Sequence, residues 1–98
     1  MLVELSGEAD VTNCEDLREV LDEVVSRAPR TMVIDMDQLR FMDSSALHVI
    51  LQATRALDRQ GGVLALARPT ETVARMLHLT ATDQLIPVYP TVREAVAG

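Results

Sequence analysis

Two hydrophobic patterns alternate along the chain: short continuous apolar runs, and longer stretches in which apolar residues recur every three to four positions. Apolar runs at residues 2–5, 32–36 and 63–67 are typical of β-strands, and the last two are typical of strands buried on both faces. A fourth run, at residues 85–89, contains Pro87, which confines it to the edge of a sheet. The chain is therefore predicted to contain four short strands.

Helical signals separate these runs. The capping-box sequence at residues 12–15 opens an amphipathic helix that Pro29 ends. Residues 44–59 form a second amphipathic helix, with apolar and polar positions on opposite faces. Helix-start signals at Thr70 and Thr91 predict two shorter helices.

Strands and helices thus alternate four times, which predicts an α/β fold with parallel strands joined by right-handed helical crossovers. Because the last strand is weak, we expect a mixed sheet of about four to five strands with four helices. Residues 1–98 have the length of one domain. Sites in such sheets favour the carboxyl ends of strands, and the predicted loop at residues 39–43 lies at such an end.

Composition excludes several kinds of function. The net charge of -6 disfavours nucleic-acid binding, and one Phe and one Tyr without Trp provide no stacking platform. The chain has a single cysteine, Cys14, and two histidines, which argues against a disulfide or a metal site. It also lacks a phosphate-binding glycine loop, so no cofactor is predicted. The chain has neither a signal peptide nor an apolar run of about 18 residues, which predicts a cytoplasmic protein without membrane insertion.

The most informative residues are Asp43, Ser44 and Ser45, which open the second helix. A phosphate on Ser44 would be stabilised by the free backbone N–H groups and the dipole of the helix N-terminus. Alternatively, Ser44 is only a helix cap, and sequence chemistry by itself favours this simpler reading. Asp43 is read either as a carboxylate that favours the helix dipole or as a residue that positions Ser44. Ser45 is a second capping hydroxyl and a fallback phosphate acceptor.

Three motifs occur in order along the chain. The Asp-Ser-Ser sequence at 43–45 follows a buried strand, residues 5–10 read Leu-Ser-Gly-Glu-Ala-Asp, and a Gly-Gly pair at 61–62 precedes a strand. In these motifs the chain resembles the STAS domain, the family of bacterial anti-sigma factor antagonists. The chain departs from the family pattern at Ala46 and His48, where the family has glycine. The family also has one more strand before residue 2, so this strand is expected to be shortened or absent here.

The resemblance implies an anti-sigma factor antagonist. Its unphosphorylated form would bind an anti-sigma factor with serine kinase activity and free a sigma factor. Phosphorylation at Ser44 would block binding, and a protein phosphatase would reset the switch. The partner-binding residues implied are Asp10, Asp43, Ser45, Ala46 and His48. The alternative is a non-switching STAS interaction subunit of a lipid-transport or stress-signalling complex.

Two further expectations concern catalysis and self-association. A serine hydrolase needs a Gly-x-Ser-x-Gly elbow, and residues 42–46 lack both glycines, so we predict that the chain is not an enzyme. His48 is read as an exposed or interface residue rather than a hydrolytic base. If residues 2–5 leave a strand edge unpaired, two copies are expected to associate as a homodimer.

Overall fold

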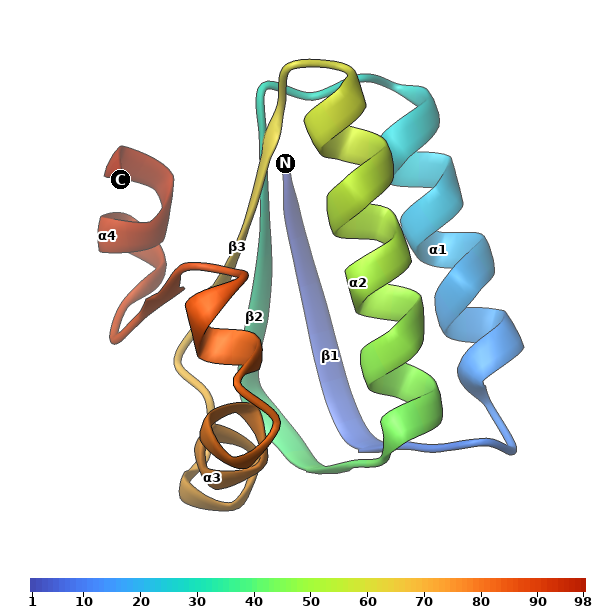
Figure 1. Cartoon of the computed structure of the whole chain (residues 1–98), viewed down its shortest axis with the longest axis vertical. Helices are drawn as coiled ribbons and strands as arrows, with labels where there is room; N and C mark the ends of the chain where they lie inside the picture. Colours follow the sequence, from blue (N-terminus) through green and yellow to red (C-terminus); the bar gives the residue numbers. More distant parts are fainter.

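The computed structural model describes all of residues 1–98, in which strands and helices alternate along the chain (Figure 1). The elements are β1 (Leu2–Ala9), α1 (Cys14–Ser26), β2 (Thr31–Met42), α2 (Ser44–Arg59), β3 (Val63–Ala67), α3 (Glu71–Leu79), the 3₁₀ turn η1 (Thr82–Gln84), β4 (Val88–Tyr89) and α4 (Val92–Ala97). The single α/β domain with four helices is confirmed.

The four strands form one sheet in the order β1-β2-β3-β4, and all three pairings are parallel. The expectation of a mixed sheet is therefore wrong. Each of the strands β2, β3 and β4 is reached through a helical crossover, which returns the chain to the same end of the sheet. Even the two-residue β4 therefore runs parallel to β3. The carboxyl ends of β1 and β2 consequently meet at one edge, at the bottom of Figure 1.

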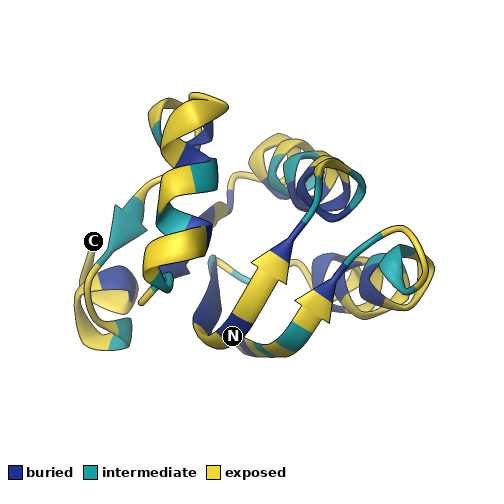
Figure 2. Ribbon diagram, turned by 90° about the horizontal axis from the view of Figure 1, so that it is seen from below, coloured by how far each residue is buried: buried dark blue, intermediate teal, exposed yellow.

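Helices cover the two faces of the sheet unequally. The helices α1 and α2 lie side by side on one face and enclose the main apolar core between themselves and the sheet (Figures 1 and 2). On the other face, Ala95 of α4 packs against Val33, Ala65 and Ala67 in a smaller cluster. None of the helices combines the length and apolar character that a membrane crossing requires.

β2 is longer than expected, because the predicted loop at residues 39–43 continues the strand to Met42. Opposite β1, β2 advances three residues from Asp35 to Gln38 and two from Leu39 to Phe41, where β1 advances two and one. These two bulges break the regular alternation of buried and exposed positions, so the polar residues there look like a loop in the sequence. The bulged strand carries the chain to the start of α2.

An ion pair between a buried carboxylate and an exposed guanidinium joins β2 to the residue after β3. Asp35, only 4% exposed, accepts hydrogen bonds from Arg68 Nε at 3.1 Å and Nη2 at 2.6 Å. The hydrogen bonds from the Arg68 guanidinium hold the pKa of Asp35 below its ordinary value. Arg68 itself has a φ of 53°, in the left-handed region. This backbone conformation is uncommon for residues other than glycine.

Candidate functional site

Two loop segments meet at the carboxyl edge of the sheet. The loop after β1, residues 10–13, lies beside Asp43, the residue between β2 and α2 (Figure 1). The backbone N–H of Asp43 donates to Ala9 O at 3.0 Å, and the N–H of Val11 donates to Asp43 Oδ2 at 3.0 Å. The structure thus brings the two sequence motifs at residues 5–10 and 43–45 into direct contact.

Asp43 caps α2. Its Oδ1 accepts a hydrogen bond from Ala46 N–H at 3.1 Å, while Oδ2 binds the loop through Val11. Both carboxylate oxygens are therefore engaged, one by the helix and one by the neighbouring loop. This double role follows from an aspartate in extended conformation directly before a helix.

Ser44 is the first residue of α2 rather than its cap. The capping reading of Ser44 is therefore wrong, because Asp43 already occupies that position. Ser44 is exposed, and no hydrogen bond within the chain engages its hydroxyl. Ser45 is half-buried at the next position. Of the two adjacent serines, Ser44 offers the more accessible hydroxyl.

The first turn of α2 also retains free backbone donors. The N–H of Ala46 is bonded to the Asp43 side chain, and that of Leu47 to Asp43 O at 3.1 Å. The N–H groups of Ser44 and Ser45 have no partner within the chain, as is usual in a first helical turn. Together with the helix dipole, they favour a negative charge at this position.

Asp10 stabilises its own loop. Its Oδ1 accepts hydrogen bonds from the Thr12 backbone N–H at 2.9 Å and from the Thr12 hydroxyl. These bonds, that from the Thr12 hydroxyl first, hold the pKa of Asp10 below its ordinary value. Thr12 does not cap α1; the cap is Asn13, whose side chain instead accepts from Asp10 N–H and donates to Glu8 O. The capping-box expectation for residues 12–15 is wrong in this respect.

The remaining partner-binding candidates, His48 and Ala46, both lie on α2 but differ in their exposure to solvent. His48 is exposed, one helical turn beyond Ser44, and the two therefore share one face. Ala46 is completely buried in the main core, so its assignment to the partner surface is wrong. Further along the exposed face, Gln52 accepts a hydrogen bond from Arg18 of α1. At Gln52, the exposed face of α2 that begins at Ser44 is thus in contact with α1.

Two exposed apolar residues lie at the same carboxyl edge of the sheet and were not among the site residues predicted from the sequence. Val11 is 67% exposed and Phe41 is 45% exposed. Phe41 is the only phenylalanine of the chain and lies three residues before Ser44, which is a signal that sequence reasoning had available. Large apolar side chains in such positions contribute to protein interfaces.

The structure holds no group of three or more His, Cys, Asp or Glu residues arranged to bind a metal ion. Cys14 is half-buried and packs against the main core, with its Sγ 3.6 Å from Val11 O. This edge of the sheet therefore offers the serine hydroxyls of α2, of which that of Ser44 is exposed, and free backbone N–H donors. It also carries the Asp43 carboxylate, with both oxygens hydrogen-bonded, and the Asp10 carboxylate, with Oδ1 hydrogen-bonded.

Comparison with known proteins agrees with these motifs. The profile of the STAS domain family matches residues 1–95. An anti-sigma F factor antagonist from Paenibacillus polymyxa is 32% identical over 90 residues, which cover 91% of this chain and 77% of that protein. The chain belongs to the STAS domain family.

Solved structures of similar proteins have the same fold. A crystal structure of an anti-sigma factor antagonist from Mycobacterium paratuberculosis superimposes with a TM-score of 0.89 at 28% identity, covering 98% of this chain and 81% of that one. The anti-sigma factor antagonist SpoIIAA, in its unphosphorylated form, gives a TM-score of 0.82 at 26% identity, covering 97% and 83%. The predicted STAS-like α/β fold class and the family are confirmed.

Proposed function

We propose that this chain is an anti-sigma factor antagonist switched by phosphorylation of Ser44. In its unphosphorylated form it binds an anti-sigma factor that is also a serine kinase, and this binding frees a sigma factor for transcription. A protein phosphatase restores the unphosphorylated form, and the cycle takes place in the cytoplasm. Support comes from the names of the relatives, anti-sigma factor antagonists, and from the description of the SpoIIAA structure as unphosphorylated.

The free hydroxyl of Ser44 is the observation that carries the proposal. Asp43 performs the capping, so a kinase can modify Ser44 without removing a hydrogen bond that the fold uses. A phosphate at the first position of α2 would meet the unpartnered N–H groups of Ser44 and Ser45. The helix would therefore accept the modification with little change in backbone structure.

Phosphorylation would act on docking instead. A phosphate adds about -1.5 to -2 charges and would lie beside the Asp43 carboxylate, on a chain that already carries a net charge of -6. A partner surface shaped for the free hydroxyl would face a bulky dianion and an uncompensated loss of solvation. A loss of about 2–4 kcal/mol would weaken binding by some tens- to hundreds-fold.

The proposed docking surface consists of the rim residues around Ser44. Asp10 and Asp43 supply negative charge at the ends of β1 and β2, and Ser45 and His48 extend the surface along α2. The exposed side chains of Val11 and Phe41 supply its apolar part. A mixed surface of this kind, with apolar anchors and a polar rim, suits a reversible protein partner.

Incubation with the cognate kinase and ATP, followed by mass spectrometry, tests the acceptor site. We expect one phosphate, on Ser44, in the original chain and in the Ser45→Ala control. The Ser44→Ala variant is expected to take up none. A phosphate found on another residue would remove Ser44 from this role, and a chain that is never phosphorylated would favour the non-switching interaction subunit.

A further inference from the structure

A groove of about 280 Å³ lies beside the C-terminal turns of α2. Its lining residues come from three elements: those turns of α2, the start of β3, and residues 85–87, which lead into β4. Ser44 begins the same helix, so the groove and the proposed phosphorylation site lie toward opposite ends of α2.

The apolar part of the groove comes from Leu64, Leu85 and Pro87. Leu64 is almost completely buried, whereas Leu85 is 67% exposed. An exposed leucine beside a hollow offers apolar surface that a bound molecule can cover, which favours binding through the hydrophobic effect.

The backbone of β3 adds a hydrogen-bond donor. The N–H of Val63 donates to Arg30 O on the β2 side, and the N–H of Leu66 donates to Pro87 O on the β4 side, both at 2.9 Å. Since successive N–H groups of a strand point to alternate sides, the N–H of Leu64 points to the β4 side. β4 pairs with β3 only from Leu66 onward, so the N–H of Leu64 has no strand partner.

Two opposite charges on α2 also line the groove. Arg55 and Asp58 lie one helical turn apart, and neither forms an ion pair within the chain. Asp58 lies in the last turn of α2, where the helix dipole disfavours a negative charge. A carboxylate placed against the stability of its helix, without a cation of the chain to compensate it, is typical of a binding residue.

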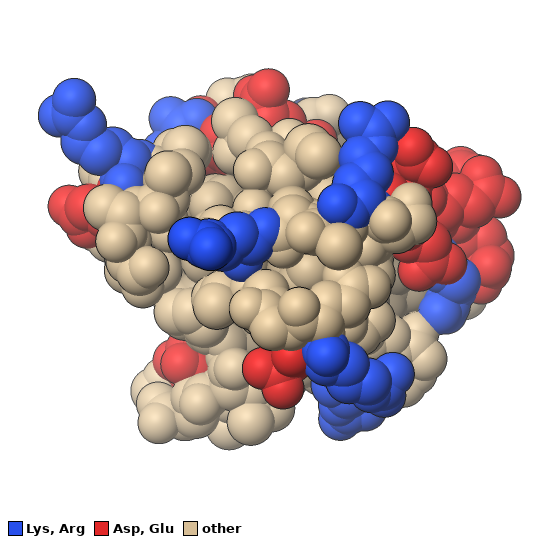
Figure 3. All heavy atoms as spheres, turned by 90° about the horizontal axis from the view of Figure 1, so that it is seen from above, with Lys and Arg blue, Asp and Glu red and all other residues tan.

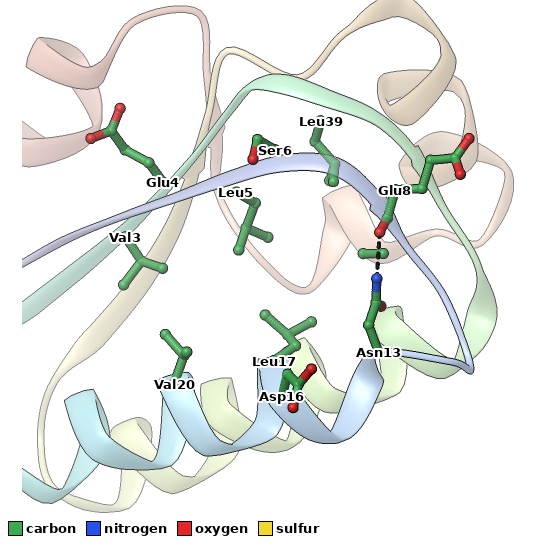
Figure 4. Close-up of a pocket in the computed structure, with 11 residues that line it drawn as sticks. Val3, Glu4, Leu5, Ser6, Glu8, Asn13, Asp16, Leu17, Val20 and Leu39 are labelled. Atoms are coloured by element: carbon green, nitrogen blue, oxygen red, sulfur yellow. Dashed lines mark hydrogen bonds between the residues drawn. The ribbon is translucent and has the colours of Figure 1, made fainter.

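Other charged parts of the molecule do not provide this combination. Figure 3 shows the end of the molecule at which α2 terminates, with blue side chains spread over it and most red ones gathered at its right side, over α1. The hollow between β1 and α1 in Figure 4 is lined by Glu4, Glu8 and Asp16 and by no basic residue. Of these two hollows, the groove beside α2 is thus the one that offers both charges.

We propose that this groove binds a free aliphatic amino acid in its zwitterionic form. Arg55 would hold the carboxylate, to which the N–H of Leu64 is a second donor, and Asp58 would hold the ammonium group. The aliphatic side chain would cover Leu85. This orientation places the ammonium group nearer the C-terminus of α2, where the dipole favours a positive charge.

The size and the charges of the groove favour a small molecule over a protein segment. Its volume lies at the lower end of ligand sites, which begin at about 300 Å³, and so suits a ligand of few atoms. An internal peptide segment carries neither of the two adjacent charges, and a chain terminus carries only one. The inference does not depend on the switch at Ser44.

An amide NMR titration of the full chain with leucine tests the proposal. For a ligand of this size we expect a dissociation constant on the order of 1 mM. Shifts should concentrate in residues 54–58, 62–64 and 85–87, and residues 3–5, which line the hollow of Figure 4, should not respond.

Three related ligands separate the contributions. N-acetyl-leucine lacks the ammonium group and leucinamide lacks the carboxylate, so each is expected to bind about tenfold more weakly through the loss of a charged hydrogen bond. Glycine keeps both charges but has no side chain, and should also bind about tenfold more weakly. Equal affinities for leucine and leucinamide, or for leucine and N-acetyl-leucine, would overturn the proposal.

Protein variants complete the test. Arg55→Gln and Asp58→Asn are each expected to weaken leucine binding about tenfold. Arg59→Gln, at the same end of α2 but outside the groove, is the matched control and should leave the affinity unchanged. Asp58→Asn should be at least as resistant to urea as the original chain, because the charge that it removes opposes the helix dipole.

Two results would contradict the site. One is the absence of saturable shifts in the groove at about 10 mM leucine, ten times the expected dissociation constant. The other is an Asp58→Asn variant that folds normally and binds leucine as tightly as the original chain.

Discussion

The Asp43 carboxylate accepts the backbone N–H of Val11 at 3.0 Å, across 32 positions of sequence. Because the other oxygen of Asp43 caps α2 through Ala46, one side chain couples the loop after β1 to the helix that begins with Ser44. Asp43 thus links the two segments that the family motifs mark, beyond the pairing of β1 with β2.

Substitution of Asp43 should separate its two roles. Asp43→Ala loses both hydrogen bonds and is expected to destabilise the fold by about 1–3 kcal/mol in urea unfolding. Asp43→Asn retains a helix-capping oxygen but offers Val11 an amide group that cannot accept as a carboxylate does. Its stability should fall less, while hydrogen exchange of the Val11 amide accelerates. Unchanged exchange at Val11 in Asp43→Asn would argue against the coupling.

Acid should weaken the ion pair between Asp35 and Arg68. Because the pKa of Asp35 in the folded chain lies below its ordinary value of 3.8, its carboxylate contributes fully to stability above that value. The contribution is lost as the pH falls through the lowered pKa. Asp35→Asn should therefore be less stable than the original chain at neutral pH, with a difference that shrinks in strong acid.

Urea unfolding of both chains between about pH 6 and about pH 2.5 measures this difference. Asp22→Asn, an exposed substitution on α1, is the control, and it should follow the original chain throughout. A stability difference for Asp35→Asn that is independent of pH would contradict the assignment.

The adjacent glycines before β3 are required for different reasons. A Cβ on Gly62 would lie 2.7 Å from Pro29 O and 2.8 Å from Leu57 Cγ, whereas one on Gly61 would meet open space. Gly62→Ala is therefore expected to cost about 1–3 kcal/mol through overpacking. Gly61, with a φ of 81°, resists alanine through backbone strain, and asparagine should relieve part of this cost. Thermal unfolding measures these costs. If Gly62→Ala unfolds at the same temperature as the original chain, the neighbours of Gly62 move to make room and the overpacking account is wrong.

The proposed contribution of Asp10 to docking is separable from its role in the loop. Asp10→Asn keeps a side-chain oxygen for the Thr12 donors and removes the charge. Affinity for the anti-sigma factor is expected to fall by about tenfold if the charge faces the partner. Glu23→Gln, on α1 and paired with Arg27, should leave affinity unchanged. Equal losses in the two variants would place the partner elsewhere.

Local sequence patterns determined much of this fold. The apolar period and the following glycines predicted α2 with both ends correct, because helix periodicity and termination are local properties. The continuation of β2 to Met42 was missed, since its partner residues lie in β1 and its bulges disrupt alternation. The pairing of Asp35 with Arg68 was also missed, although an aspartate within an apolar run signals a buried carboxylate that needs a partner.

The place of Asp43 and Ser44 in the fold, between β2 and α2, followed from the sequence, whereas their individual contacts did not. The Asp-Ser-Ser motif located Ser44 and Asp43, because strand ends and helix starts can be recognised locally. The division of roles between Asp43 and Ser44 depends on the conformation of the cap, and the burial of Ala46 depends on the orientation of α2 against the sheet. Neither property follows from residue types alone.

The affinity of the chain for its anti-sigma factor, before and after phosphorylation, tests the central proposal most directly. Measured by calorimetry without ATP, the unmodified chain and Ser44→Ala should bind equally well. The phosphorylated chain and Ser44→Asp should fold normally, by circular dichroism, yet bind some tens- to hundreds-fold more weakly. Ser44→Ala should also remain bound when ATP is added. A phosphorylated chain that binds as tightly as the unmodified one would contradict the switch.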